Sequence, residues 1–236
     1  MINTIPYESL GHNKFGWLDA RHHFSFGGYD NPDRVHFGAL RVINDDIVKA
    51  GAGFDTHPHS NMEIITFVRK GAITHRDSQG NLGRTEAGDV QVMSAGTGIY
   101  HSEFNMESVD TTLFQIWIIP NKYNVEPRWD ARTLSRDYAT DALPLLVSGR
   151  EEDEGKGALF IHQDAAIYGG KMKEGTSIDQ PIKHQAYVLV SEGEIEIDGT
   201  TLKRGDGAEI TDTKLSRIKA LSEAEIVVID VPEYRR

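Results

Sequence analysis

Short runs of apolar, β-branched and aromatic residues, separated by turn-forming residues, dominate the pattern along this chain. In its first half, such runs occupy residues 36–43, 63–69, 72–76, 89–93 and 111–119. Glycine, asparagine or proline bounds each run, and these residues end strands and make turns. Helical periodicity is hard to find over any stretch of about ten residues. The pattern therefore predicts an all-β fold of antiparallel barrels or sandwiches.

A second series of strand-like runs follows a polar, irregular stretch at residues 120–144. The series comprises residues 186–190, 194–197, 207–210 and 226–231. The length of 236 residues suits two lobes of roughly 100–130 residues each. We therefore interpret the stretch between the two series as the connection between lobes, partly packed through Trp129. The expected division places one lobe at residues 1–125 and the other at residues 126–236.

The charge balance limits the partners that this protein can have. The chain carries 25 basic and 36 acidic residues, a formal net charge of −11 with neutral histidines. An acidic surface repels phosphate, which argues against nucleic acid or an anionic membrane as a partner. No apolar run approaches the roughly 20 residues that cross a bilayer, and the N-terminus lacks the features of a secretory signal. We therefore expect a cytoplasmic protein that binds neither nucleic acid nor membrane.

The chain contains no cysteine and ten histidines. The lack of thiols excludes disulfides, thiolate metal sites and cysteine nucleophiles. The sequence also contains neither a G-x-S-x-G nucleophile motif nor a phosphate loop of the G-x-x-x-x-G-K type. Any bound metal must therefore be held by histidine nitrogen and carboxylate oxygen.

Two triplets, His57-Pro58-His59 and His101-Ser102-Glu103, carry the residue types of such a site. In an extended chain, residues i and i+2 point to the same face, so each triplet can present two ligands in one direction. Three imidazoles and one carboxylate suit iron, manganese, nickel, copper or zinc, and leave coordination positions open for water, oxygen or substrate. One such triplet arises by chance in many proteins, but the two together favour a reactive metal site.

The surroundings of the first triplet resemble the first sequence motif of the cupins. Gly51, the H-x-H pair His57 and His59, Glu63 and Gly71 follow the cupin order of glycine, histidines, glutamate and glycine. The interval from Glu63 to Gly71 is one residue longer than in the general cupin pattern. The pirins, a bicupin branch of the cupin superfamily, share this longer interval.

The surroundings of the second triplet resemble the second cupin motif, through Gly88, Gly96, His101 and Asn105. Ser94 stands where most cupins have proline, and the gap between Gly96 and His101 is longer than usual. The pirins share these departures as well. Four further stretches look like pirin sequence: Gly53–His59, Met93–Ile99, Trp17 with His22–Phe26, and Ile161–Asp164.

The chain thus resembles the pirin family over most of residues 12–170 and more weakly over its last third. The resemblance implies an all-β bicupin made of two cupin-type β-barrels with short helices and loops. It also implies that His57, His59, His101 and Glu103 hold one divalent transition metal per chain, with Fe(II) favoured over Ni, Mn, Cu, Zn or Co. Glu63, a ligand in other cupins, is not one in pirins, and we expect it to be structural.

Several pirins are quercetinases, so the resemblance implies a dioxygenase similar to quercetin 2,3-dioxygenase. Its partners would be a small, flavonol-like aromatic substrate and O2, with ring cleavage and release of carbon monoxide. Glu103 would act as a metal ligand or as the general base for a substrate hydroxyl. Other pirins regulate protein partners. The alternative function is therefore a metal-dependent binding or redox-sensing protein without physiological turnover.

A weak internal repeat predicts that the second lobe lacks a metal. Residues 68–73 can be laid over residues 190–195, and Gly88 over Gly205. On this repeat the four ligand positions fall on Asp179, Pro181, Ile218 and Ala220. We therefore expect chemistry in the N-terminal lobe alone.

The other histidines have structural explanations. We expect His22 and His23 to pack between aromatic residues, His75 to be structural, and His184 to lie at the surface or to pack. Five apolar residues could wall a pocket, although core packing is the default for each: Phe24, Phe26, Phe37, Met62 and Met93.

Overall fold

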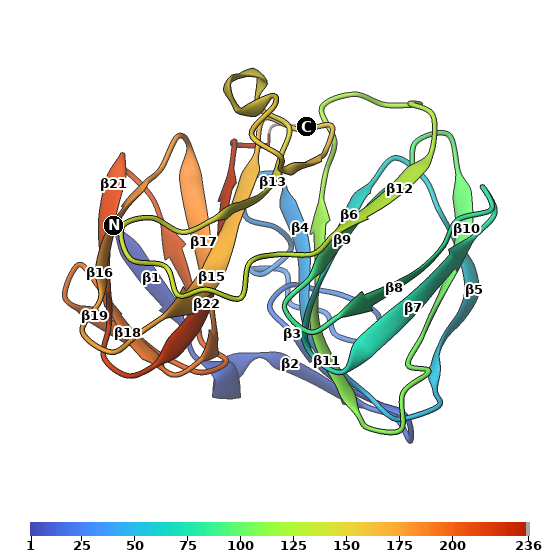
Figure 1. The fold of residues 1–236 in the computed structure, drawn as a ribbon, viewed down its shortest axis with the longest axis horizontal. Helices are drawn as coiled ribbons and strands as arrows, with labels where there is room; N and C mark the ends of the chain where they lie inside the picture. Colours follow the sequence, from blue (N-terminus) through green and yellow to red (C-terminus); the bar gives the residue numbers. More distant parts are fainter. Residues whose placement is uncertain (235–236) are drawn as a thin grey trace.

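The computed structural model describes residues 1–234, which form two all-β lobes that lie side by side (Figure 1). Strands from the first half of the chain, drawn blue to green, build the N-terminal lobe, and strands drawn orange to red build most of the C-terminal lobe. The helices in the described part are two 3-10 helices, Tyr7–Ser9 and Glu151–Asp153. The predicted all-β, two-lobe fold is confirmed.

In the N-terminal lobe, a seven-stranded sheet with the order β12-β9-β6-β11-β4-β3-β2 packs against a four-stranded sheet with the order β5-β10-β7-β8. The strands are β2 (Gly11–Lys14), β3 (Leu18–His22), β4 (Leu40–Val48), β5 (Gly53–His59), β6 (Glu63–Lys70), β7 (Ala72–Asp77), β8 (Leu82–Glu86), β9 (Val90–Ser94), β10 (Ile99–Phe104), β11 (Thr111–Ile118) and β12 (Arg128–Arg132).

The C-terminal lobe repeats this arrangement, with the sheet orders β1-β20-β17-β22-β15-β13-β14 and β16-β21-β18-β19. The strands are β1 (Ile2–Ile5), β13 (Leu145–Ser148), β14 (Leu159–Phe160), β15 (Ala166–Met172), β16 (Ser177–Pro181), β17 (Gln185–Glu192), β18 (Glu194–Ile197), β19 (Thr200–Lys203), β20 (Gly207–Ile210), β21 (Leu215–Ala220) and β22 (Ala224–Val231). Each lobe is thus two facing sheets, closed by side-chain packing, rather than one continuously hydrogen-bonded cylinder.

Each lobe contains one strand from the part of the chain that forms most of the other lobe. Strand β1 pairs with β20 in the C-terminal lobe, with Ile2 opposite Ile210, and Figure 1 shows it beside the orange and red strands. Strand β12 lies within the stretch expected to be irregular, yet it pairs with β9 of the N-terminal lobe. The division of the chain at residue 125 stays a prediction.

One hydrophobic core joins the two lobes. It is formed where the two seven-stranded sheets meet, and Phe67 and Phe114 of the N-terminal lobe belong to the same buried cluster as Leu189 and Val227 of the C-terminal lobe. The buried hydroxyl of Tyr187 lies 2.9 Å from Nδ1 of His23 across this boundary. The N-terminal lobe is therefore braced by its neighbour on the side opposite to β5 and β10.

The ends of some strands differ from the prediction. Strand β4 begins at Leu40 and not at residue 36, because Gly38 has a φ of 53° and turns the chain just before it. Residues 77–81 form the tip of the hairpin between β7 and β8, where the Asp77 carboxylate accepts hydrogen bonds from the backbone N–H groups of Gln79 and Asn81. The start of β4 and the hairpin tip both depend on backbone geometry, which the pattern of hydrophobic residues does not report.

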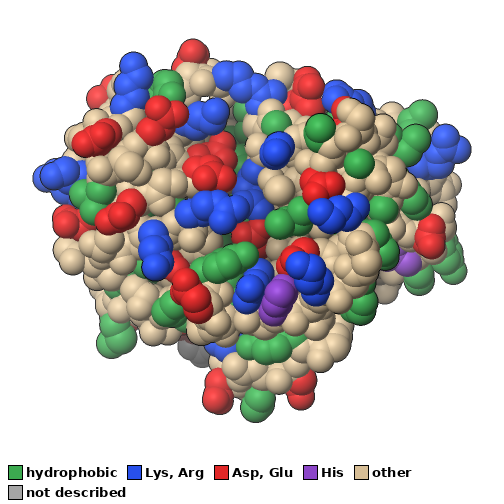
Figure 2. All heavy atoms as spheres, turned by 90° about the horizontal axis from the view of Figure 1, so that it is seen from below, with side chains coloured by type: hydrophobic (Ala, Val, Ile, Leu, Met, Phe, Trp, Pro, Cys, Tyr) green, Lys and Arg blue, Asp and Glu red, His purple; other side chains and the backbone are tan. Residues whose placement is uncertain are grey.

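The outer surface carries charge of both signs. On the face shown in Figure 2, acidic and basic side chains are interspersed rather than gathered by sign. In the described part of the chain, no helix has the length and apolar character needed to span a membrane.

Candidate metal centre

The two predicted ligand triplets lie on neighbouring antiparallel strands. In the register of β5 and β10, His57 is opposite His101 and His59 is opposite Ile99. The ladder shifts between His101 and Glu103, as at a β-bulge, so the glutamate is displaced relative to β5. Local strand geometry and one pairing therefore bring the three histidines together.

The three imidazoles face one another closely. The Nε2 atoms of His57 and His101 are 3.1 Å apart. The ring centroid of His59 is 4.8 Å from that of His57 and 5.0 Å from that of His101. One potential ligand atom from each residue lies within 4.8 Å of the others. Such an arrangement can hold a single ion.

A hydrogen bond orients His57, and burial favours the neutral, metal-binding form of His59 and His101. Nδ1 of His57 lies 2.6 Å from the carbonyl oxygen of Asp55, so it carries the proton and Nε2 presents its lone pair to the other rings. Burial, followed by the neighbouring imidazoles, lowers the pKa of His59 to about 4 and that of His101 to about 3. The donor set of this cluster therefore fits a borderline divalent transition metal.

Glu103 is fixed at the inner end of the same pocket. Its side chain is buried, Oε1 accepts a hydrogen bond from Nε2 of Gln91 at 2.7 Å, and Oε2 accepts one from Nε2 of Gln115 at 2.8 Å. The hydroxyl of Thr66 lies 3.2 Å from Oε1. An ionised carboxylate offers about four lone-pair sites, so these bonds orient the group and leave acceptor capacity free.

Glu103 belongs to a second cluster rather than to the one formed by His57 and His59. Its ligand atom groups with those of His101 and His75. This second cluster is fully buried, and Nε2 of His75 is already bonded to the Asp77 carboxylate at 2.8 Å. The three-histidine cluster is the partly exposed one and fits a reactive site better. Glu103 as the fourth ligand stays a prediction.

The metal pocket is small and has an aromatic rim. Its volume is about 60 Å3. Its lining residues are Phe26, Asn44, Asp46, Phe54, His57, His59, Ile64, His101, Glu103, Gln115 and Trp117. The ring centroid of Trp117 is 4.9 Å from that of His59 and 5.3 Å from that of Phe26. A cavity of this volume holds a few water molecules, so the pocket admits only the edge of a larger molecule.

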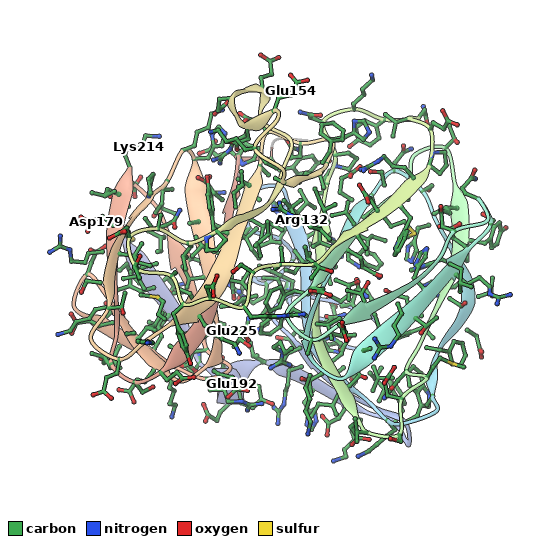
Figure 3. The ribbon with its side chains drawn as sticks, in the orientation of Figure 1. Arg132, Glu154, Asp179, Glu192, Lys214 and Glu225 are labelled. Carbon is green, nitrogen blue, oxygen red and sulfur yellow. The ribbon has the colours of Figure 1, made fainter. Side chains whose placement is uncertain are left out.

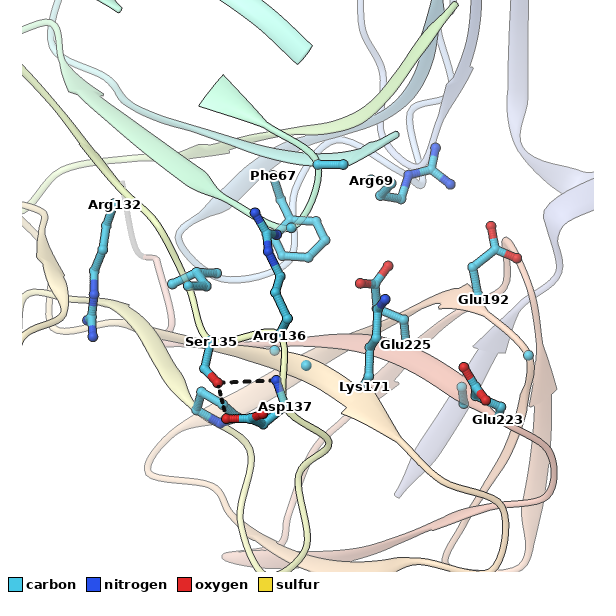
Figure 4. Close-up of a pocket in the computed structure, with 18 of the residues that line it drawn as sticks. Phe67, Arg69, Arg132, Ser135, Arg136, Asp137, Lys171, Glu192, Glu223 and Glu225 are labelled. Carbon is cyan, nitrogen blue, oxygen red and sulfur yellow. Dashed lines mark hydrogen bonds between the residues drawn. The ribbon is translucent and has the colours of Figure 1, made fainter. Parts of the chain in front are cut away.

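A larger cavity, of about 470 Å3, lies between the lobes (Figure 4). Several charged side chains around it are already paired, Arg69 with Asp45 and Arg136 with Asp89. Figure 3 shows Glu225, another lining residue, at the boundary between the lobes. Because no predicted ligand lines this cavity, the smaller pocket is the candidate centre.

The sequence did not single out the inner wall of the metal pocket. Asn44, Asp46 and Gln115 come from β4 and β11, and all three are buried. The available signal was the polar triplet at residues 44–46 inside an otherwise apolar strand. His75, expected to be structural, lies directly behind His101, with 3.4 Å between their Nδ1 atoms.

Other expected roles can be compared with the contacts. Glu63 is buried, accepts a hydrogen bond from Ser94 at 2.7 Å and does not line the metal pocket. His22 bonds to Asn44 at 2.7 Å, and His184 bonds to Asp164 at 2.8 Å. These contacts agree with structural roles.

The corresponding positions of the C-terminal lobe hold no such cluster among residues 1–234. Strand β16 pairs with β21 much as β5 pairs with β10. Asp179 forms an exposed ion pair with Arg217, and Figure 3 shows it on the outer side of the lobe. Ile218 and Ala220 are fully buried in the core. Apolar packing thus occupies the positions of Ile218 and Ala220, while the absence of a second metal stays a prediction.

Comparison with known proteins gives matches over nearly the whole chain. Residues 5–118 match the family described as Pirin, and residues 145–231 match the one described as the quercetinase C-terminal cupin domain. A pirin-like protein of Caulobacter vibrioides is 44% identical over 98% of this chain and 99% of its own length. The quercetin 2,3-dioxygenase of Escherichia coli K12 is 40% identical over 98% of this chain and 99% of its own length.

Solved structures agree with these matches. The crystal structure of bacterial pirin YhhW from Escherichia coli in complex with nickel(II) has a TM-score of 0.90 and 38% sequence identity. The match covers 99% of this chain and all of that one. A crystal structure of quercetin 2,3-dioxygenase from Acinetobacter baumannii, at 21% identity and a TM-score of 0.74, shows the same fold over 95% of this chain and 85% of its own.

Proposed function

Because the chain belongs to the pirin family, we propose that it is a metal-dependent dioxygenase whose metal is held by His57, His59, His101 and Glu103. The observation that carries the proposal is the cluster of three imidazoles, with the Nε2 atoms of His57 and His101 only 3.1 Å apart. Relatives named quercetin 2,3-dioxygenase support the reaction class.

The metal would be one divalent transition ion per chain. When bound, it supplies Lewis acidity and redox chemistry toward a substrate that chelates through adjacent oxygens. We propose Fe(II) as the metal for aerobic ring cleavage, while the similar structure of bacterial pirin YhhW contains nickel(II). Availability selects among ions that the same nitrogen and oxygen ligands bind.

The protein's own residues would orient the substrate and accept its proton. Gln91 and Gln115 hold Glu103 through both carboxylate oxygens, so the group cannot swing freely. Glu103 can therefore act as a ligand or take the proton of a substrate hydroxyl as general base. Phe26 and Trp117 at the rim would contact the faces or edges of an aromatic ring.

The substrate that we propose is a flavonol such as quercetin, whose ring is cleaved by reaction with O2, with carbon monoxide released as the second product. The names of the relatives support this substrate. The pocket volume of about 60 Å3 allows only the chelating edge of a flavonol inside, with the rest of the molecule beyond the aromatic rim.

The proposal is tested with protein loaded separately with iron, nickel, manganese or copper. Quercetin is added under air, and the loss of flavonol absorbance and the release of carbon monoxide are followed. We expect turnover with at least one metal and none with H57A or H101A, which should also lose the metal. H184A, which removes a histidine of the C-terminal lobe, is the matched control.

Two results would contradict parts of this proposal. Metal content that survives both H57A and H101A would overturn the ligand assignment. If the protein retains each metal but turns over quercetin with none of them, the flavonol dioxygenase proposal is overturned. The alternative function, a metal-dependent regulatory protein, would then be tested by searching for a protein partner that binds only when the metal is in one oxidation state.

A further inference from the structure

Asp46 is an acidic side chain of the metal pocket that has no partner among residues 1–234. It lines the pocket with the three histidines and Glu103, and only 2% of its surface is exposed. Its Oδ1 atom is buried without a hydrogen bond, and among residues 1–234 no hydrogen bond or ion pair reaches either carboxyl oxygen. The other carboxylate of the pocket, Glu103, is by contrast held by two amides.

The register of β4 explains why Asp46 lacks a partner. Successive side chains of a strand point to opposite faces, so Asp45 and Asp46 point apart. Asp45 takes the available cation, Arg69, in a buried ion pair. The residues opposite Asp46 on the neighbouring strands are Ala20 and Leu113, neither of which offers a polar side chain.

An unpartnered carboxyl group in this position opposes stability. A buried polar group that loses its water without gaining a hydrogen bond is destabilising, so such groups are rare in folded proteins. Burial, and then the negative charges of Asp45 and Glu103, raise the pKa of Asp46 well above its usual range. Groups retained against stability concentrate at functional sites, where a ligand completes their contacts.

We propose that Asp46 is a second binding contact for the substrate, in addition to the metal held by the histidines. Its carboxyl group would form a hydrogen bond with a substrate hydroxyl that lies next to the chelating oxygen pair. This inference rests on the proposed function and deepens it. A hydroxyl group can donate to a carboxylate or exchange hydrogen bonds with a carboxylic acid, so the contact forms in either protonation state. Asn44 and Gln115, which line the same wall, are already bonded to His22 and Glu103.

The small volume of the pocket defines the substrate class. Only an oxygen very close to the chelating pair can reach Asp46 within about 60 Å3. The substrate is therefore an aromatic molecule with a chelating oxygen pair and a third oxygen, a hydroxyl, beside it. In a flavonol that chelates through its 3-hydroxyl and 4-keto oxygens, the third oxygen is the 5-hydroxyl. Fisetin, which is quercetin without the 5-hydroxyl, lacks this group.

The test compares the two flavonols by binding, without turnover. Nickel-loaded wild-type protein, D46N and D46L are titrated with quercetin and with fisetin under nitrogen, and quenching of tryptophan fluorescence gives each Kd. We expect the wild type to bind quercetin at least about tenfold more tightly than fisetin, because one buried hydrogen bond to a charged or acidic group is worth about that factor. In D46L the two flavonols should bind equally, and D46N should retain part of the preference.

Metal content and the Tm of each variant separate this role from a structural one. We expect both variants to keep the metal, and D46L to melt at the same temperature as the wild type or higher, because an unpartnered carboxyl group has been removed. Should D46L fail to fold, the preference retained by D46N decides the matter, and a full preference would overturn the inference.

The outcomes distinguish this inference from the proposed function. If wild type binds both flavonols and the quercetin preference is unchanged in the variants, Asp46 is not the second binding contact and the dioxygenase proposal stands. A loss of metal in both variants would also overturn the inference, since Asp46 would then act on the metal site. If metal-loaded wild type binds neither flavonol, the flavonol proposal fails and the inference fails with it.

Discussion

His75 and His101 face each other inside the N-terminal lobe, with 3.4 Å between their Nδ1 atoms. His75 is completely buried, and its Nε2 atom is bonded to Asp77 at 2.8 Å. Its ring stacks on Trp129 with centroids 5.1 Å apart. A chain of contacts thus runs from Asp77 through His75 to the back of a proposed metal ligand. Such contacts fix the ring orientation of a ligand histidine.

Substitution H75F should therefore weaken metal binding while preserving the stack on Trp129. Removal of a group that orients a ligand typically lowers metal affinity by about 10–100-fold. Affinity is measured by competition with a chromophoric chelator. H162F is the matched control, because the ring of His162 contacts Phe160 outside the metal pocket. Equal affinities for H75F and the wild type would show that His75 does not orient His101.

Trp129 should be sensitive to a single added methyl group. A Cβ atom at Gly83 would lie 2.0 Å from the Trp129 ring, whereas one at Gly16 would have no atom within 4 Å. We expect G83A to lower the free energy of unfolding by about 1–3 kcal/mol through overpacking and G16A to have almost no effect. Urea unfolding of both metal-free variants checks this, and equal midpoints would contradict the observed packing.

His23 should make the protein sensitive to acid. It is fully buried at the boundary between the lobes, and burial, followed by the charge of Arg34, lowers its pKa to about 3 from 6.5. His23 therefore binds a proton in the unfolded chain below pH 6.5 but not in the folded one. Its contribution to the free energy of unfolding is fully present above that pH and is lost as the pH decreases toward 3. Between pH 7 and pH 5, His23 alone should account for a loss of about 2 kcal/mol.

The measurement is the free energy of unfolding of metal-free protein at several pH values, in the wild type and in H23Q. Glutamine does not titrate, so the slope between pH 6.5 and pH 5 should be smaller in the variant. The absolute stability of H23Q is not the test, since the contact with Tyr187 also changes. An unchanged slope would assign the acid sensitivity to other groups.

Metal should stabilise the protein through the three-histidine cluster. An ion that binds only the native state at about 100 times its Kd adds about 2.7 kcal/mol to the free energy of unfolding. We expect chelation to lower the Tm of metal-loaded wild type and the added metal to restore it. The Tm of H57A should respond to neither treatment. A restored Tm in H57A would place the binding ion elsewhere.

Parts of the fold followed directly from local patterns. The strands near residues 63–69, 72–76 and 111–119 were predicted within one or two residues, because apolar, β-branched runs bounded by turn-forming residues report local backbone geometry. Strand β12 was missed inside residues 120–144, since it forms by pairing with β9 and not from a strong pattern of its own.

The candidate site divides in the same way. His57 and His59 lie two residues apart, and so do His101 and Glu103, so extended chain aligns each pair without help from the rest of the fold. Asp46, Gln91 and His75 come from three other strands. Their convergence depends on the register of two sheets, which neither composition nor spacing specifies.

The sequence by itself determined that a metal in this protein must be bound by nitrogen and oxygen, because the chain has histidine and carboxylate but no cysteine. It also determined which four residues are the candidate ligands. Only the tertiary structure decided that Glu103 is held by Gln91 and Gln115, and that Asp46 faces the pocket without a partner. The physical reason is that side-chain types are fixed along the chain, whereas their hydrogen-bond partners depend on which strands the fold brings together.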